Sequence, residues 1–289
     1  MWTAIADAIS TVAGTPFKLE RRTAIGGGCI NSAYRVEGSG TAYFVKVNAA
    51  DKQEMFAAEA AALHEIADTR TIRVPRPLCH GVNQDASWLV LEYIPLARRG
   101  DSRALGKQLA ALHRVTAENF GWRRNNTIGA TPQLNTPSAD WVAFWRECRL
   151  GFQLRLAAAN GYHGSLQREG EKLLAALPVF FTSHHPLPSL LHGDLWSGNI
   201  AFDRMGQPVI FDSATYYGDR EADLAMTELF GGFSEDFYTA YRTAFRLDGG
   251  YAVRKDLYNL YHVLNHLNLF GGGYLEHAER LVARLLAEV

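Results

Sequence analysis

One short stretch in the C-terminal half restricts the fold of this chain more than any other feature. It reads His192-Gly-Asp194-Leu-Trp-Ser-Gly-Asn199, which fixes a histidine, a carboxylate and an amide at H-x-D-x-x-x-x-N spacing. Two short apolar segments follow, joined by a turn that contains Gly206, and the second ends at Asp212. A hairpin of this kind returns the chain toward its starting point. We therefore expect Asp212 to lie near Asn199.

These residue types suit phosphoryl transfer. The Asp194 carboxylate could orient an attacking hydroxyl and accept its proton, while the Asn199 amide oxygen and the Asp212 carboxylate are ligands suited to a Mg²⁺ ion that bridges ATP phosphates. The pattern predicts Asp194 as the catalytic base and the other two residues as metal ligands. The alternative is a loop that carries these residues by chance, which would occur in roughly 3% of chains of this length.

A lysine and a glutamate in the N-terminal half extend the predicted site. Lys46 lies in a strand pattern over residues 41–47, and Asp51 is a candidate N-cap for the alanine-rich helix that follows. Glu59 falls on the apolar stripe of that helix, where a charge needs a partner. Lys46 would supply it, and such a pair positions the α- and β-phosphates of ATP. The alternatives are an edge-strand lysine and a glutamate at the border of the stripe.

A glycine-rich turn and a strand end complete the predicted nucleotide site. Glycines let backbone N–H groups approach phosphate oxygens without steric cost, although a plain hairpin turn would explain the same residues. A second segment precedes a proline at the end of a strand, where backbone groups could bind adenine. The predicted ATP-binding residues in these two segments are Gly26, Gly27, Gly28, Cys29, Ile30, Asn31, Glu92, Tyr93 and Ile94.

Composition narrows the class of protein. The chain has 289 residues, 47% of them apolar, with 29 basic and 30 acidic side chains and a net charge of −1. This balance gives no basic field for nucleic acid or an acidic membrane, so neither partner is expected. The N-terminus predicts a short amphipathic helix that stops at Gly14, rather than a signal peptide, and no apolar run could span a bilayer. Three scattered cysteines favour a reducing, cytoplasmic location.

The predicted secondary structure changes near residue 94. Residues 17–94 are rich in strand patterns around one helix, whereas the rest is mostly helical with a short β segment near 199–212. We expect an α+β protein, with an N-terminal nucleotide-binding domain over 1–94 and a catalytic and substrate domain over 95–289.

With these pieces in order, the chain resembles the fructosamine kinase, or ketosamine-3-kinase, family, which is related to the aminoglycoside phosphotransferases. The resemblance covers nearly the whole chain and is most specific in 26–31, 191–199, 216–233 and 257–268, supported by 120–122 and 126–129. It implies a two-lobed protein-kinase-like fold. One departure is Ser213, where the family usually shows proline.

The resemblance implies phosphorylation of the 3-hydroxyl of a ketosamine, either a small molecule or a glycated protein lysine, by a monomer or homodimer that uses ATP and Mg²⁺. Trp196 and His266 are candidates for the sugar pocket, with a core tryptophan and a satisfied helix histidine as the alternatives. Cys29 is a candidate redox switch, because some family members form redox-dependent dimers through a cysteine at this position. Cys79 and Cys148 are expected to be small buried hydrophobes.

An acidic run follows the predicted metal site and contains Asp219, Glu221, Asp223 and Glu228. These side chains could attract a cationic amine, or Asp223 could brace a helix while the others face water.

Two other functions remain open. A kinase of the same fold that acts on an aminoglycoside or choline would share the catalytic loop. A catalytically inactive scaffold would be expected to lack one of the predicted functional residues.

Overall fold

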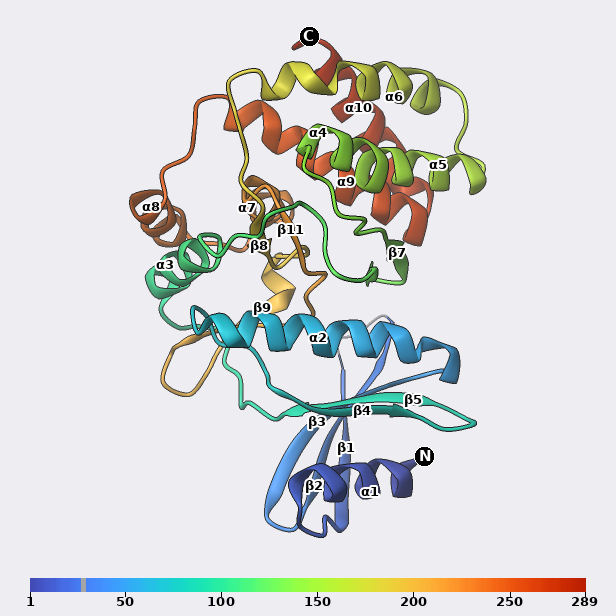
Figure 1. Cartoon of the computed structure of the whole chain (residues 1–289), viewed down its shortest axis with the longest axis vertical. Helices are drawn as coiled ribbons and strands as arrows, with labels where there is room; N and C mark the ends of the chain where they lie inside the picture. The colour runs from blue at the N-terminus through green and yellow to red at the C-terminus, as the bar shows by residue number, and fades with distance from the viewer. Residues whose placement is uncertain (27–29) are drawn as a thin grey trace. The chain divides into compact units, whose positions relative to one another are not determined.

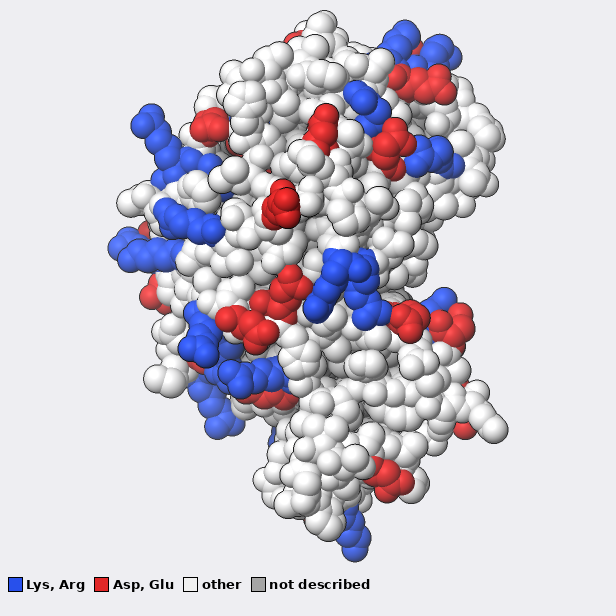
Figure 2. Space-filling view, viewed as in Figure 1, with Lys and Arg blue, Asp and Glu red and all other residues white. Residues whose placement is uncertain are grey.

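The computed structural model describes residues 1–26 and 30–289, and its internal contacts divide the chain into two compact units (Figure 1). The first unit contains Met1–Asp101 and Ile200–Ser213, and the second contains Ser102–Asn199 and Ala214–Val289. Lys, Arg, Asp and Glu side chains are interspersed on the face that Figure 2 shows, as the near-zero net charge leads one to expect. Among the described residues, no helix has the length and apolar character needed to cross a membrane.

An antiparallel sheet forms the centre of the first unit. Its strands are β1 (Leu19–Ile25), β2 (Ser32–Gly38), β3 (Thr41–Asn48), β4 (Pro77–Val82) and β5 (Ser87–Glu92), in the order β1-β2-β3-β5-β4. The β2–β3 register pairs Ala33 with Lys46, and the β3–β5 register pairs Lys46 with Leu89. Lys46 therefore lies on an inner strand rather than at an edge.

Two helices pack against this sheet (Figure 1). Helix α1 (Trp2–Ala13) buries Ile5 and Ile9 in a cluster with sheet residues, and it ends at Gly14, whose φ of 66° lies in the left-handed region. Helix α2 (Gln53–Thr69) contacts β4 and β5. The prediction that Asp51 caps this helix was wrong. A 3₁₀ turn, η1 (Ala50–Lys52), takes up Asp51, and the N-cap residue Lys52 makes no side-chain capping bond.

A hairpin from the second half of the sequence joins the first unit. Strands β9 (Ile200–Phe202) and β10 (Pro208–Ile210) pair antiparallel, as predicted, with Ile200 opposite Ile210. Ala97 and Phe202 exchange backbone hydrogen bonds of 2.7 and 2.9 Å. The chain therefore passes through the first unit twice.

The second unit is mainly helical, with α9 (Tyr251–Phe270) buried along most of its length. Helices α7 (Glu221–Leu229), α5 (Gly151–Ala159) and α10 (Leu275–Leu286) contact α9, and α3 (Ser102–Leu112) pairs with α8 (Glu235–Ala244). Two small antiparallel pairs of strands also belong to this unit, β6 (Asn126–Ile128) with β7 (Thr131–Gln133) and β8 (Ser189–Leu191) with β11 (Tyr216–Gly218). The remaining elements are α4 (Trp141–Phe144), the π-helix η2 (Trp145–Leu150), α6 (Ser165–Ala176), η3 (Leu177–Phe181), η4 (Ser197–Asn199) and η5 (Gly272–Tyr274).

Candidate active site

The Lys46 ammonium group lies between two carboxylates in the first unit. Its Nζ donates to Glu59 Oε1 at 2.6 Å and also to Asp212 Oδ1. The Lys46 and Glu59 side chains are only 7% and 12% exposed, whereas that of Asp212 is 48% exposed. The expected Lys46–Glu59 contact is therefore present, and the same lysine also holds a partly open carboxylate.

Burial and charge act in opposite directions on this group. Burial alone would lower the pKa of Lys46, but the neighbouring carboxylates of Asp212 and Glu59 outweigh it and raise the pKa above its usual value. Burial raises the pKa of Glu59, and the Lys46 charge opposes that shift. The ammonium is therefore a permanent cation near neutral pH.

Asp212 occupies a backbone conformation that few residues with side chains adopt. Its φ is 58°, in the left-handed region, where aspartate is tolerated better than most residues. It follows β10 by two residues, and Asn199 directly precedes β9 at the paired end of the same hairpin. Left-handed backbone at a non-glycine residue is typical of functional sites, where the surrounding structure enforces it.

The described end of the glycine-rich turn is tied to the sheet. Asn48 Nδ2 on β3 donates to Asn31 Oδ1 at 2.7 Å and to the Ile30 carbonyl oxygen at 3.1 Å. Gly26 lies at the other end of the turn, in open space. The predicted phosphate-contacting residues Gly27, Gly28 and Cys29 lie outside the described residues.

Residues 92–94, predicted to bind adenine, make hydrogen bonds and packing contacts within the first unit. The Glu92 N–H donates to the Arg76 carbonyl oxygen at 2.8 Å, and the Glu92 carboxylate accepts from Arg73 Nη2 at 2.8 Å. The Tyr93 ring lies 4.7 Å from the Arg35 guanidinium, and Ile94 is buried. The Glu92 N–H is therefore already paired within the first unit.

The second unit holds the loop that carries the candidate base Asp194, after β8 (Ser189–Leu191). Asn199 Nδ2 donates to the Asp194 carbonyl oxygen at 2.9 Å and to Asp194 Oδ2 at 3.2 Å. The Asp194 N–H donates to His192 Nδ1 at 3.2 Å, so that nitrogen carries no proton. The amide of Asn199 thus points its nitrogen toward the candidate base, which orients its oxygen away from Asp194.

A buried carboxylate of α7 fixes this loop, and the sequence reasoning assigned it no such role. Asp223 accepts from the backbone N–H groups of His192 at 2.7 Å and Gly193 at 2.8 Å, and it also contacts His113 Nε2 at 3.1 Å. Burial would raise the pKa of Asp223, but the hydrogen bond and charge of His113 and the backbone bonds hold it below its usual range. An ionised acceptor of this kind makes strong hydrogen bonds.

Gly193 is required by both its conformation and its surroundings. Its φ is 84°, and an added Cβ would lie 2.1 Å from the Ala214 carbonyl oxygen. No other residue fits this approach without moving the backbone. The glycine in the H-x-D motif therefore sets the path by which the chain reaches Asp194.

The two candidates for the sugar pocket occupy different environments. Trp196 is 39% exposed, and its ring lies against Gly198, where an added Cβ would come within 2.2 Å of it. This exposure argues against a core tryptophan. His266, on α9, is half-buried, and its Nδ1 lies 2.8 Å from the His262 carbonyl oxygen.

Comparison with known proteins places this geometry in a family. The fructosamine kinase family model matches residues 1–288. A protein named as a probable ketoamine kinase in Synechocystis sp. is 46% identical over 288 residues, covering 99% of this chain and 97% of that protein. The chain belongs to the fructosamine kinase family. A chloroplastic protein-ribulosamine 3-kinase of Arabidopsis thaliana is 42% identical over 273 residues, covering 93% of this chain and 83% of that protein.

Solved structures agree with this membership and with the predicted fold. A crystal structure of a Haemophilus somnus protein assigned as a fructosamine-3-kinase has a TM-score of 0.91 at 27% identity, covering 99% of this chain and 98% of the other. The aminoglycoside phosphotransferase APH(4)-Ia has a TM-score of 0.61 at 15% identity, with 99% and 98% coverage. The expected α+β kinase-like fold, shared with aminoglycoside phosphotransferases, is thus confirmed.

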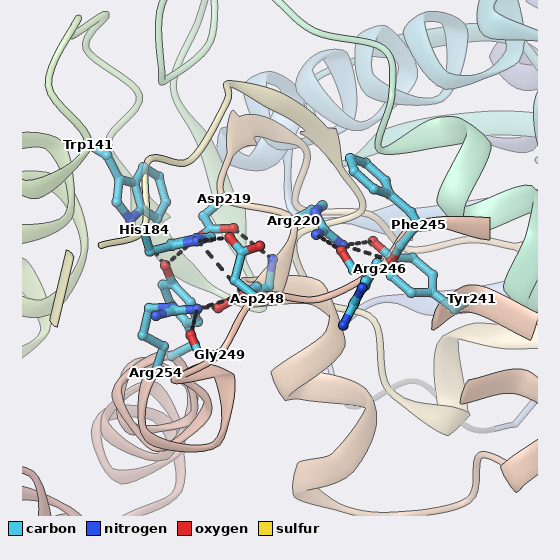
Figure 3. Close-up of polar contacts among 12 residues, drawn as sticks. Trp141, His184, Asp219, Arg220, Tyr241, Phe245, Arg246, Asp248, Gly249 and Arg254 are labelled. Atoms are coloured by element: carbon cyan, nitrogen blue, oxygen red, sulfur yellow. Dashed lines mark hydrogen bonds and ion pairs between the residues drawn. The ribbon is translucent and has the colours of Figure 1, made fainter. Parts of the chain in front are cut away.

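In this member of the fructosamine kinase family, Asp219 and Glu221 of the acidic run are buried rather than facing water. Figure 3 shows the polar contact between Asp219 and His184. Asp219 accepts from the Tyr258 hydroxyl at 2.6 Å and lies 2.8 Å from His184 Nε2, while His184 Nδ1 lies 2.7 Å from Asp248 Oδ2. Glu221 accepts two hydrogen bonds from Arg254, at 2.7 and 3.0 Å. The expectation that these acidic side chains face water was wrong for Asp219 and Glu221.

The same cluster has ligand atoms spaced as a metal site would have them. Atoms of His184, Asp219 and Glu221 lie within 4.8 Å of one another. However, the Arg254 guanidinium already neutralises Glu221, and His184 must be doubly protonated to donate to two carboxylates. The arrangement is therefore a network in which each of these carboxylates already has a cationic partner, rather than a set of open metal ligands.

Proposed function

We propose that this protein is an ATP-dependent ketosamine 3-kinase that phosphorylates the 3-hydroxyl of a sugar-derived ketosamine. Full-length membership of the fructosamine kinase family supports the proposal, as do relatives named as ketoamine kinase and ribulosamine 3-kinase. The observation that carries it is the Lys46 ammonium group, which pairs with both Glu59 and Asp212. This is the arrangement required of a lysine that positions ATP phosphates beside a metal-binding aspartate.

In this proposal Asp194 accepts the proton of the substrate hydroxyl as that oxygen attacks the terminal phosphate of ATP. Asn199 holds Asp194 through its amide nitrogen, and Asp223 holds the backbone of the loop. Lys46 contacts the α- and β-phosphates, the glycine-rich turn from Gly26 to Asn31 covers the phosphates, and the 92–94 segment binds adenine. Trp196 and His266 contact the sugar.

Magnesium is the metal that these residues fit. The Asn199 amide oxygen and the partly exposed Asp212 carboxylate are the hard oxygen ligands that Mg²⁺ prefers. When bound, Mg²⁺ neutralises charge that develops on the phosphate oxygens. The Lys46 contact orients the Asp212 carboxylate.

The proposed product explains the value of the reaction. C3 is bonded directly to the C2 carbonyl carbon. Loss of a proton from C1 gives a 1,2-enaminol, which expels inorganic phosphate from C3, and water then hydrolyses the resulting imine and releases the amine. The enzyme would begin the removal of sugar from glycated small amines or protein lysines.

Kinetics on matched substrates test the proposal. ATP turnover should be highest with one of fructosyl-, ribulosyl- or erythrulosyl-lysine and near background with kanamycin and choline. The Asp194→Asn variant should lose about 10²-fold or more in kcat while still binding ATP. Turnover of kanamycin or choline above all three ketosamines would replace the proposal with another kinase activity of this fold. No thermal stabilisation by Mg²⁺ and ATP would favour a scaffold.

A further inference from the structure

Three aromatic rings surround the imidazole of His266 in the second unit. The distances between ring centroids are 5.0 Å to Phe230, 5.5 Å to Phe270 and 5.2 Å to Tyr274. Phe230 and Phe270 are nevertheless 44% and 58% exposed. Large aromatic side chains that gather at the surface and remain open commonly mark a binding site. We call these four residues the aromatic cage.

Hydrogen bonding fixes the protonation of the histidine in this cage. A carbonyl oxygen can only accept, so the contact with His262 O places the proton of His266 on Nδ1. Burial lowers the pKa of His266, which keeps the ring neutral near neutral pH. Its Nε2 is then a hydrogen-bond acceptor on a ring that has three aromatic neighbours.

The aromatic cage is also connected to the catalytic loop. Phe230 follows α7 directly and leads into Gly231 and Gly232. Gly232 lies so close to the loop that an added Cβ would come within 2.5 Å of the Ser197 Cβ. Ser197 is the neighbour of Trp196 and lies three residues after Asp194, so the segment that carries Phe230 packs against the loop of the candidate base.

We propose that the aromatic cage binds the protonated secondary amine of the ketosamine, and so selects substrates in which the sugar is attached to a cationic nitrogen. This inference rests on the proposed function. An alkylammonium group remains charged near neutral pH, its positive charge is attracted to the faces of aromatic rings, and its N–H can donate to His266 Nε2. A sugar hydroxyl offers only the hydrogen bond, and a neutral ether offers neither interaction.

A pair of substrates that differ only at this atom tests the proposal. The ratio of kcat/KM for fructosyl-lysine to that for a 1-O-alkyl fructose, with ether oxygen in place of nitrogen, measures recognition of the charge. Phe230→Leu and Phe270→Leu keep apolar bulk but remove the ring, and each should reduce this ratio about threefold to tenfold. His266→Phe keeps a ring but removes the acceptor and should also reduce it. The KM for ATP should stay the same in all three variants.

The control is Phe152→Leu, the same change at a half-buried phenylalanine of α5, which should leave the ratio unaltered. An unchanged ratio in the cage variants, or an equal loss on both substrates, would overturn the cage while leaving the kinase assignment intact. If the wild-type enzyme phosphorylates none of the three ketosamines but does phosphorylate another alcohol, the proposed function fails, and the cage proposal fails with it. If it prefers ribulosyl- or erythrulosyl-lysine, the matched pair is built on that sugar.

Discussion

Two buried charged residues in this protein position other groups through hydrogen bonds and ion pairs. Lys46 holds a glutamate and an aspartate, and Asp223 holds two backbone N–H groups together with His113. Charge-assisted hydrogen bonds in buried surroundings are stronger than those between neutral groups and fix geometry more tightly. Substitutions that keep size but remove charge can therefore separate positioning from folding.

The Glu59→Gln variant tests the contribution of the ion pair between Lys46 and Glu59. Lys46 keeps Asp212 as an anionic partner, so the loss of stability should stay below the ~3 kcal/mol typical of breaking an isolated buried pair. The lysine would no longer be fixed from the helix side, and kcat/KM for ATP should fall about 10- to 100-fold. Steady-state kinetics and denaturant unfolding measure both effects. Glu37→Gln, which removes a more exposed partner of Arg35, is the control and should change neither.

Asp223→Asn tests the support of the catalytic loop. The amide nitrogen of asparagine would face a backbone N–H, so at least one buried donor loses its acceptor, at a cost of about 1–3 kcal/mol in unfolding free energy. We expect kcat to fall at least tenfold with little change in the KM for ATP. Asp236→Asn, in an exposed ion pair with Arg103, is the matched control. Unchanged kcat in a stable Asp223→Asn protein would show that the loop needs no such support.

At the scale of elements, charges tie a connecting segment to the buried start of α7 (Figure 3). Arg220 donates to the carbonyl oxygens of Phe245 and Arg246, and His184 reaches Asp248 in the same segment between α8 and α9. Burial would lower the pKa of His184, but the hydrogen bond and charge of Asp219 raise it. The segment is therefore held partly by a titratable cation.

The stability of this network should depend on pH in a defined direction. Because the folded-state pKa of His184 is raised above 6.5, its contribution is fully present below pH 6.5 and is lost as the pH rises through the folded value. The difference in unfolding free energy between wild type and His184→Gln should be largest near pH 6 and shrink toward pH 9. His185→Gln, at the exposed neighbouring position, should show no such trend. A difference independent of pH would mean that His184 acts only through packing.

At the scale of the whole molecule, the chain passes between its two units close to the proposed metal ligands. One crossing is the Asn199–Ile200 bond and another is the Ser213–Ala214 bond, one residue after Asp212. The β9–β10 register brings the ends of the intervening segment together. The proposed ligands are thereby attached to one hairpin.

Redox-dependent dimerisation through Cys29 stays a prediction for the whole molecule. Burial raises the pKa of Cys79 to about 11 and also raises that of Cys148, so neither forms a thiolate readily. An oxidant should therefore produce a dimer and alter activity in wild type but not in Cys29→Ser, as read on non-reducing gels and in assays with and without reductant. An oxidant-insensitive wild type would end this idea.

From the sequence alone, the family and the kinase-like fold followed from a resemblance in its motifs, whereas the pairing of Lys46 with Glu59 followed from local spacing. Strand alternation and helical period decide which side chains face inward, and a charge on an apolar stripe demands a partner.

Only the tertiary structure decided what Asp223, His184 and the aromatic cage contact. Asp223 appeared in the sequence as one acid in a run, yet its partners lie 30, 31 and 110 residues away along the chain. Whether a charged residue near a helix start faces water or closes a buried network depends on which distant segment packs over it. Local periodicity carries no information about that choice, because the free energy of burying a charge is set by partners that folding alone brings together.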